Sequence, residues 1–134
     1  MMVGSFEYVI DEKGRLFIPA KFREEIGESI VLFMDGAAGC LVGYSQQRME
    51  KIRENIDASP RSVKTGMRNV FYYAMEAVPD KQGRITISPE LRKLAGLDSK
   101  SEVIIIGSMS NIEIWSKSRI PDMGTGTLPD NIGL

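Results

Sequence analysis

Histidine is absent from the 134 residues of this chain, and cysteine occurs once. Without histidine the chain lacks the commonest general base and the commonest zinc ligand, and no Ser-His-Asp or Cys-His arrangement can form. One cysteine cannot form an internal disulfide or a thiolate metal site, so we expect Cys40 to be a small buried hydrophobe. We therefore expect no enzyme activity, no metal and no cofactor.

Long apolar runs and nucleotide-binding motifs are missing as well. No stretch approaches the length of a membrane span and no N-terminal signal peptide is visible, which predicts a cytoplasmic protein with no membrane contact. No phosphate loop of the form Gly-x-x-x-x-Gly-Lys-Ser/Thr occurs. Gly124-Thr125-Gly126 lies in the C-terminal tail, away from the strand and helix that a dinucleotide site needs.

An excess of charge of either sign is also missing. The 17 basic and 18 acidic residues give a net charge of −1, and the pI is near 5.5. This balance counts against a general nucleic-acid binder, but a specific one depends on local charge placement rather than on the sum. The 43% hydrophobic and 26% charged content is typical of a soluble globular protein.

What the sequence does contain is an internal repeat. The pattern DEKGRLFIP of residues 11–19 returns as DKQGRITIS at residues 80–88, with Asp, Gly, Arg and the alternating apolar positions preserved. The same offset aligns Arg23 with Arg92 and Gly27 with Gly96. The chain therefore holds two copies of one structural unit.

Each copy predicts a hairpin followed by a short helix and two further strands. Asp11 with Gly14, and Asp80 with Gly83, structure the turns, because Asp bonds the backbone ahead of it and Gly takes positive φ. Apolar alternation on both sides of each turn predicts a hairpin that presents an arginine just past its turn. Ser88 is a good N-cap for the second helix. The helix residues expected to face inward are Phe22, Ile26, Leu91, Leu94 and Ala95.

These elements predict an α+β fold, mainly β, with two tandem repeats and flanking helices. The first repeat spans residues 5–47 and the second residues 76–119, with connecting helices over residues 48–75. Ser59 is the expected N-cap of the second connecting helix. Residues 120–134, rich in Gly, Thr, Asp and Pro, indicate a flexible tail. A unit this small buries little core alone, so the repeats should pack together.

The first candidates for a binding site are the basic residues of the turns: Lys13, Arg15, Lys81 and Arg84. The planar guanidinium suits guanine edges and phosphates, and the lysine ammonium suits phosphate. The alternative is a structural role, in which Arg15 pairs with Asp11 and Arg84 with Asp80 across their own turns. Both interpretations are correct if the aspartate orders the arginine side chain before it binds.

A second group of basic residues follows on the predicted helices: Lys21, Arg23, Arg92 and Lys93. These are candidates for phosphate contacts, and the alternative, pairing with nearby glutamates on a solvated face, is favoured for Lys93. A solvated face is also favoured over a phosphate track for the stripe of Arg61, Lys64 and Arg68. Packing in the core or at an interface is favoured over base stacking for Tyr44, Tyr72, Tyr73 and Trp115.

These segments resemble MraZ, a family of bacterial regulators in the SpoVT/AbrB-like superfamily. Residues 11–19 match the first hairpin of the family and residues 80–92 the second. Arg68-x-x-Phe71-x-x-Ala74 matches its connecting helix, and Gly107 followed by Ile112-Glu113-Ile114-Trp115 matches the end of its second repeat. The resemblance covers about residues 1–120.

The resemblance implies a pseudo-symmetric pair of AbrB-like repeats in a swapped-hairpin barrel, assembled into a ring-shaped homo-oligomer. It implies a sequence-specific, DNA-binding transcriptional regulator, mainly a repressor, associated with the nucleoid. Its expected partner is promoter DNA with direct repeats, in the division and cell-wall gene cluster. The Asp-x-x-x-Arg of each hairpin, here Asp11/Arg15 and Asp80/Arg84, would contact that DNA. Gln82 stands where the first copy has Lys13, so the two turns should not read DNA identically.

The alternative function is a protein-interaction module of the AbrB-like antitoxin type. Those relatives use one AbrB-like half and a disordered tail that wraps a toxin. This chain has two halves and a short tail, which disfavours the alternative.

Overall fold

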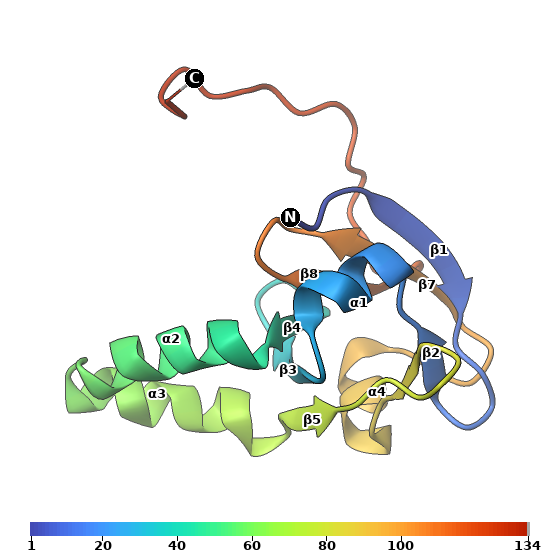
Figure 1. Cartoon of the computed structure of the whole chain (residues 1–134), viewed down its shortest axis with the longest axis horizontal. Helices are drawn as coiled ribbons and strands as arrows, with labels where there is room; N and C mark the ends of the chain where they lie inside the picture. Colours follow the sequence, from blue (N-terminus) through green and yellow to red (C-terminus); the bar gives the residue numbers. More distant parts are fainter. Residues whose placement is uncertain (134) are drawn as a thin grey trace.

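A computed structural model describes residues 1–133 of the chain, and its elements follow the predicted repeat (Figure 1). The first half contains β1 (Ser5–Val9), β2 (Arg15–Phe17), α1 (Ala20–Ile26), β3 (Ile30–Asp35) and β4 (Cys40–Ser45). The second half contains β5 (Met75–Ala77), β6 (Arg84–Thr86), α4 (Pro89–Ala95), β7 (Glu102–Gly107) and β8 (Ile112–Ser116). Between the halves lie α2 (Gln46–Asp57) and α3 (Arg61–Tyr72). The order of strands and helices is the same in both halves.

The strands form two antiparallel sheets. Six strands pair in the order β1-β7-β8-β4-β3-β5, and β2 pairs with β6 in a separate two-stranded sheet, here called the central ribbon. The mixture of helices with a mainly antiparallel sheet is as predicted. The closed barrel is not present in the described part of the chain, because β1 and β5 remain the two edges of an open sheet.

The predicted local hairpins are wrong. The strands on either side of each turn do not pair with each other: β1 pairs with β7 from the second half, and β2 pairs with β6. β7 offers β1 five residue pairs, from Ser5↔Ile106 to Val9↔Glu102, whereas β2 is only three residues long. The longer partner satisfies more backbone groups of β1, so the first turn carries the chain out of the large sheet and into the central ribbon. The second turn makes the same crossing, from β5, which pairs with β3, to β6.

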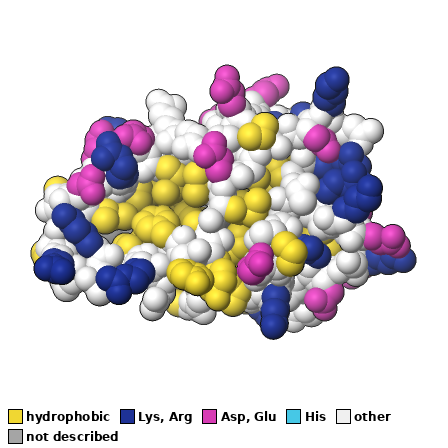
Figure 2. Space-filling model, turned by 90° about the horizontal axis from the view of Figure 1, so that it is seen from below, with side chains coloured by type: hydrophobic (Ala, Val, Ile, Leu, Met, Phe, Trp, Pro, Cys, Tyr) yellow, Lys and Arg dark blue, Asp and Glu magenta, His cyan; other side chains and the backbone are white. Residues whose placement is uncertain are grey.

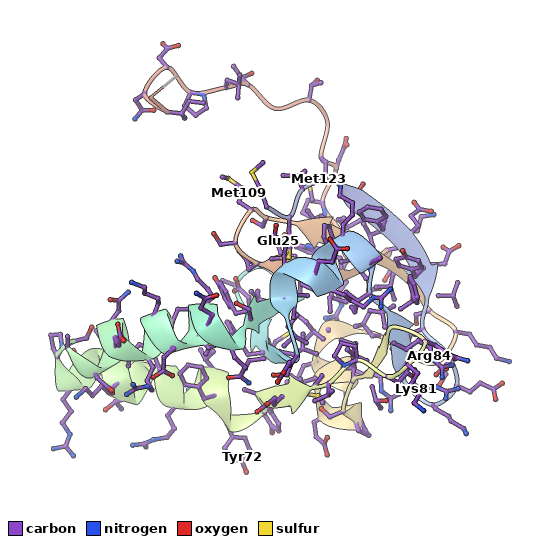
Figure 3. The ribbon with its side chains drawn as sticks, viewed as in Figure 1. Glu25, Tyr72, Lys81, Arg84, Met109 and Met123 are labelled. Carbon is purple, nitrogen blue, oxygen red and sulfur yellow. The ribbon has the colours of Figure 1, made fainter. Side chains whose placement is uncertain are left out.

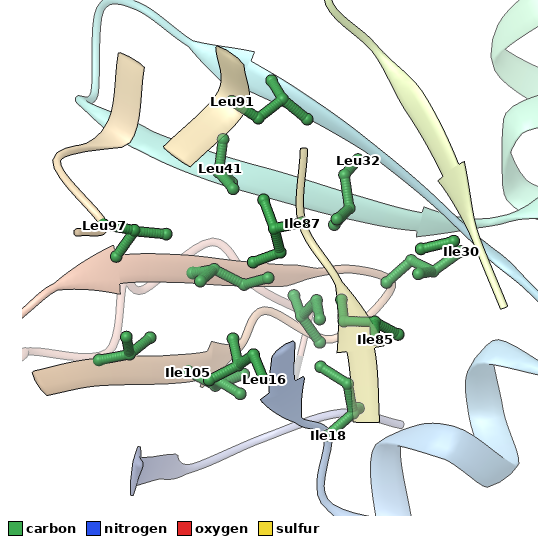
Figure 4. Packing of buried hydrophobic residues seen from close by; sticks show 14 of the residues in the cluster. Leu16, Ile18, Ile30, Leu32, Leu41, Ile85, Ile87, Leu91, Leu97 and Ile105 are labelled. Carbon is green, nitrogen blue, oxygen red and sulfur yellow. The ribbon is translucent and has the colours of Figure 1, made fainter. Parts of the chain in front are cut away.

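The core lies between the central ribbon and the large sheet (Figure 4). Leu16 and Ile85, paired in the ribbon, are fully buried and pack with sheet residues such as Leu32 and Ile105. The inward helix residues Phe22, Ile26, Leu91 and Ala95 are buried as predicted. Leu94 is 39% exposed, and the prediction that it faces inward is wrong. The core therefore draws on both halves and holds the ribbon in place.

The helix ends confirm most of the capping predictions. Ser88 accepts a hydrogen bond from the backbone N–H of Leu91 at 3.3 Å, and Gly96 ends α4 in the left-handed conformation. Ser59 is not the N-cap of α3, since Pro60 occupies that position and the Ser59 hydroxyl donates to the Asn55 carbonyl instead. Cys40 is buried as predicted, and burial raises the pKa of its thiol to about 12.

The pair α2 and α3 projects from one end of the molecule (Figure 1). Neither helix contains a buried residue, and the apolar stripe of α3, which includes Val63, Met67 and Val70, stays half-buried or exposed. Residues 121–133 form neither helix nor strand and extend away from the body. Within residues 1–133, no helix combines the length and the apolar character needed to cross a membrane.

Candidate nucleic-acid interface

The turn at residues 11–14 is built around the Asp11 side chain. Its Oδ1 accepts hydrogen bonds from the backbone N–H groups of Lys13 at 2.9 Å and Arg15 at 2.8 Å. Its Oδ2 accepts the Nε–H of Arg15 at 2.6 Å. Gly14 closes the turn by donating its N–H to the Asp11 carbonyl, at a φ of 78° that favours glycine. The Arg15 side chain is therefore held by its own turn, with 30% of its surface exposed.

The turn at residues 80–83 repeats this geometry. Asp80 Oδ1 accepts the backbone N–H groups of Gln82 and Arg84, both at 2.9 Å, and Oδ2 accepts the Arg84 Nε–H at 3.0 Å. Gly83 has a φ of 83°. The predicted aspartate–arginine pairs are thus confirmed in both turns. Lys81 and Arg84 lie at the end of the molecule away from α2 and α3 (Figure 3).

The hydrogen bonds lower the pKa of both turn aspartates. For Asp11 the largest cause is the backbone N–H of Arg15, which outweighs the opposing effect of desolvation and is helped by the Arg15 guanidinium. The backbone N–H and guanidinium of Arg84 lower the pKa of Asp80 in the same way. Each turn therefore stabilises the charged form of its aspartate.

We expect the turns to lose order only in acid. Because the folded-state pKa is lowered, the stabilisation from each aspartate is fully present above its ordinary pKa and is lost as the pH falls through the lowered value. A carbon-13 NMR titration should place the midpoints of Asp11 and Asp80 below that of aspartate in an unstructured peptide. Midpoints at or above the peptide value would contradict the hydrogen-bonded turns.

The central ribbon presents both arginines on one face. Leu16 and Ile85 lie opposite each other and point into the core. Since side chains alternate along a strand, their neighbours point the other way. The antiparallel register places Arg15 and Arg84 at diagonal positions. We call this the outward ribbon face, and it consists of Arg15, Phe17, Arg84 and Thr86.

Arg23 and Arg92, predicted as DNA contacts from the helices, lie against the turns of the opposite half. Each donates its Nε–H, at 3.0 Å, to the carbonyl oxygen of the residue just beyond the ribbon strand of its own half. Each guanidinium also packs on a turn glycine, Arg23 on Gly83 and Arg92 on Gly14. Both arginines are half-buried. The structure thus brings these helix arginines together with the turns, crosswise between the halves.

The lysines of the predicted site are exposed: Lys13, Lys21 and Lys81. Lys93 is exposed too, as expected for a solvated face. Sequence reasoning missed Lys100, whose Nζ lies 3.0 Å from Glu12 Oε1 in the first turn. Lys100 has a φ of 65°, in a loop whose Ser99 hydroxyl donates to the Glu12 carbonyl. Glu12 and Lys100 come from opposite halves of the chain, so the sequence holds no local signal for this contact. It distinguishes the first turn from the second.

The remaining candidates lie elsewhere. Arg61, Lys64 and Arg68 are exposed along α3, at the opposite end from the turns. Trp115 is buried and Tyr44 stacks on Phe33 with ring centroids 5.6 Å apart, so the packing role predicted for both is confirmed. Tyr72 and Tyr73 are exposed and outside the core.

An apolar groove lies between α3, the β3–β4 turn and α4. It measures about 330 Å³ and is lined by Met34, Gly36, Asn69, Val70, Tyr73 and Leu94. Figure 2 shows apolar side chains spread from the helical end toward the middle of this face, with basic side chains around both ends. The residues that line the groove include none of the turn residues. The groove and the turns are therefore separate surfaces.

Comparison with known proteins gives one consistent family. A family model described as "MraZ protein, putative antitoxin-like" matches residues 1–68 and 70–120. Proteins named "Transcriptional regulator MraZ" are similar along most of their length. That of Caldicellulosiruptor bescii is 41% identical over 121 residues, covering 88% of this chain and 82% of the relative. That of Lactobacillus delbrueckii subsp. bulgaricus is 43% identical over 122 residues, covering 89% and 83%.

Proposed function

This chain belongs to the MraZ family, and from that membership we propose that it is a sequence-specific DNA-binding transcriptional regulator, acting mainly as a repressor. Its relatives are named transcriptional regulators. We propose that it binds direct repeats in a promoter of the division and cell-wall gene cluster, in the cytoplasm at the nucleoid. Occupation of the promoter would then block transcription.

The observation that carries the proposal is the outward ribbon face, with an aspartate-held arginine at each of two diagonal positions. The major groove of B-DNA admits a two-stranded β-ribbon, and arginine pairs with the O6 and N7 atoms of guanine. Because Asp11 and Asp80 already hold the two arginines in the unbound protein, less side-chain entropy is lost on binding. Lys13, Lys81 and Lys21 are exposed cations for flanking phosphates.

A single subunit offers few such cations, and its net charge is −1. Each neutralised phosphate adds to a salt-dependent binding term, so a lone subunit should bind DNA weakly. We propose that a homo-oligomeric ring arrays identical ribbon faces on one rim, and that neighbouring subunits engage successive repeats. The open apolar surface of α3 and the groove beside it support assembly through the helical end, away from the ribbon.

We expect Val70→Glu to reduce the size of the oligomer. Val70 lines the apolar groove, and a charge buried there against a second subunit would be left without a partner. The matched control is Thr65→Glu, which adds the same charge to an exposed position of the same helix. Light scattering after size exclusion should give a smaller mass for Val70→Glu alone. An unchanged mass would remove this groove from the subunit interface.

The alternative, a protein-interaction module of the antitoxin type, would use the same apolar groove for a different protein. The two functions differ in what purifies with the chain. A stoichiometric protein partner that blocks DNA binding would favour the alternative, whereas a homo-oligomer that binds promoter DNA by itself favours the regulator.

A further inference from the structure

We propose that Arg23 and Arg92 are positioning residues, each holding the DNA-contacting turn of the opposite repeat. The inference rests on the proposed function, because it assigns the two helix arginines a role in that same site. It makes the turn of one repeat depend on the helix of the other.

Each arginine packs so closely on its turn glycine that a Cβ at the glycine would displace the guanidinium. A Cβ built on Gly14 would lie 2.7 Å from Arg92 Nε and 2.8 Å from its Cζ. A Cβ on Gly83 would lie 2.7 Å from Arg23 Cζ and 2.9 Å from its Nε. Both glycines are buried. Each glycine is therefore favoured by its positive φ, and a larger residue in its place would push the guanidinium off the turn.

Hydrogen bonds join each arginine–glycine contact into a closed cycle of contacts. The Gly14 carbonyl accepts the backbone N–H of Ile87 at 2.9 Å, and the Ile87 carbonyl accepts the Arg92 Nε–H at 3.0 Å. Arg92 then packs back on Gly14. The turn that carries Arg15 is thus fastened by the second repeat at two points, the strand end and the helix.

An equivalent cycle of contacts holds the other turn. The Gly83 carbonyl accepts the backbone N–H of Ile18 at 2.9 Å, and the Ile18 carbonyl accepts the Arg23 Nε–H. The Arg23 guanidinium also lies 5.5 Å from the centroid of the Phe17 ring on the outward ribbon face. Arg23 therefore links Gly83 to the face that we propose for DNA.

The chemistry of the contact selects arginine over lysine. Each cycle of contacts uses the arginine Nε–H, a donor that lysine lacks. It also uses the flat guanidinium, which lies on the glycine backbone in a way that a lysine ammonium cannot. A phosphate contact that depends on charge alone would survive the change, because lysine keeps the positive charge. Arginine-to-lysine substitution therefore separates a positioning role from a phosphate contact made through charge alone.

We expect Arg92→Lys to weaken binding to promoter DNA about tenfold, through the freed side chain of Arg15. The matched control, Arg53→Lys, makes the same change at an exposed position of α2, away from the ribbon, and should bind within twofold of the wild type. Wild-type affinity in Arg92→Lys would overturn the proposal.

Double-mutant cycles give the sharper test. Arg92→Lys should be non-additive with Arg15→Ala, because Arg15 is the residue through which Arg92 acts, and additive with Arg84→Ala. Arg23→Lys should show the reverse pattern. A general loss of fold stability or a lost phosphate contact would be additive with both alanine variants, and that result would overturn the proposal.

A measurement without DNA separates this inference from the proposed function. In Arg92→Lys the amide of Gly14 should exchange its hydrogen faster while that of Gly83 is unchanged, and Arg23→Lys should do the opposite. If the Gly14 and Gly83 amides changed their exchange rates equally in each variant, the inference would be overturned. If Arg15→Ala and Arg84→Ala both bound promoter DNA as well as wild type, the proposed function would fail, whatever the exchange result.

Discussion

Arg15→Ala should abolish tight binding to promoter DNA while the oligomer remains intact. One well-placed arginine contributes about 1–3 kcal/mol of base discrimination. The loss recurs in every subunit that touches DNA, so the affinity should fall by roughly 10²-fold or more. The local fold should persist, because Asp11 still accepts the backbone N–H groups of Lys13 and residue 15.

The control for this variant is Arg53→Ala on α2. Arg53 also pairs with carboxylates, those of Glu50 and Asp57, but its side chain lies on the helical pair, away from the ribbon. Mobility-shift titrations with both variants, together with size exclusion and melting curves, separate a local contact from a change in net charge. Equal binding by Arg15→Ala and wild type would remove Arg15 from the site.

The second large effect concerns the number of repeats in the DNA. A duplex with several correctly spaced repeats should bind about 10²–10⁴-fold more tightly than a duplex with one, since subunits of one oligomer raise the effective concentration of their neighbours. Shifting the spacing by half a helical turn should remove most of this gain, because neighbouring ribbon faces would meet opposite sides of the duplex.

Val70→Glu provides the control for this effect within the chain. If it reduces the oligomer, it should bind the single-repeat duplex as well as the wild type does and lose the preference for several repeats. Equal affinity of the wild type for one and several repeats would contradict the multivalent account.

The sequence repeat was sufficient to predict the local structure of the turns. Asp11 and Arg15 are four residues apart, as are Asp80 and Arg84, and such short-range pairs follow from turn chemistry alone. Helix ends at Ser88 and Gly96 were predictable for the same reason. Each of these features is decided by residues close together in the chain.

Strand partners could not be predicted in this way. The alternation of Leu16 and Ile18 shows which side chains are buried but not which strand lies beside them. The crossing of β2 to β6 is decided by the competition between β2 and β7 for β1, and that competition depends on the whole sheet. The failed hairpin and barrel predictions have this common cause.

The contacts that Arg23 and Arg92 make with the opposite half could not be predicted from the sequence for a related reason. The repeat aligned the two residues with each other, so a shared role was visible, but their contacts with Gly83 and Gly14 join residues from opposite halves. Leu94 illustrates the same limit, because its helical spacing suits a core position while its actual neighbours form the open groove beside α3.

The most direct test of the DNA-binding account is an electron cryo-microscopy structure of the protein on a promoter duplex with several repeats. The account predicts that the outward ribbon face of each engaged subunit enters the major groove, with the guanidinium of Arg15 or Arg84 within hydrogen-bond distance of a base edge or phosphate. A duplex lying along α3, or ribbon faces covered by neighbouring subunits and out of contact with DNA, would contradict it.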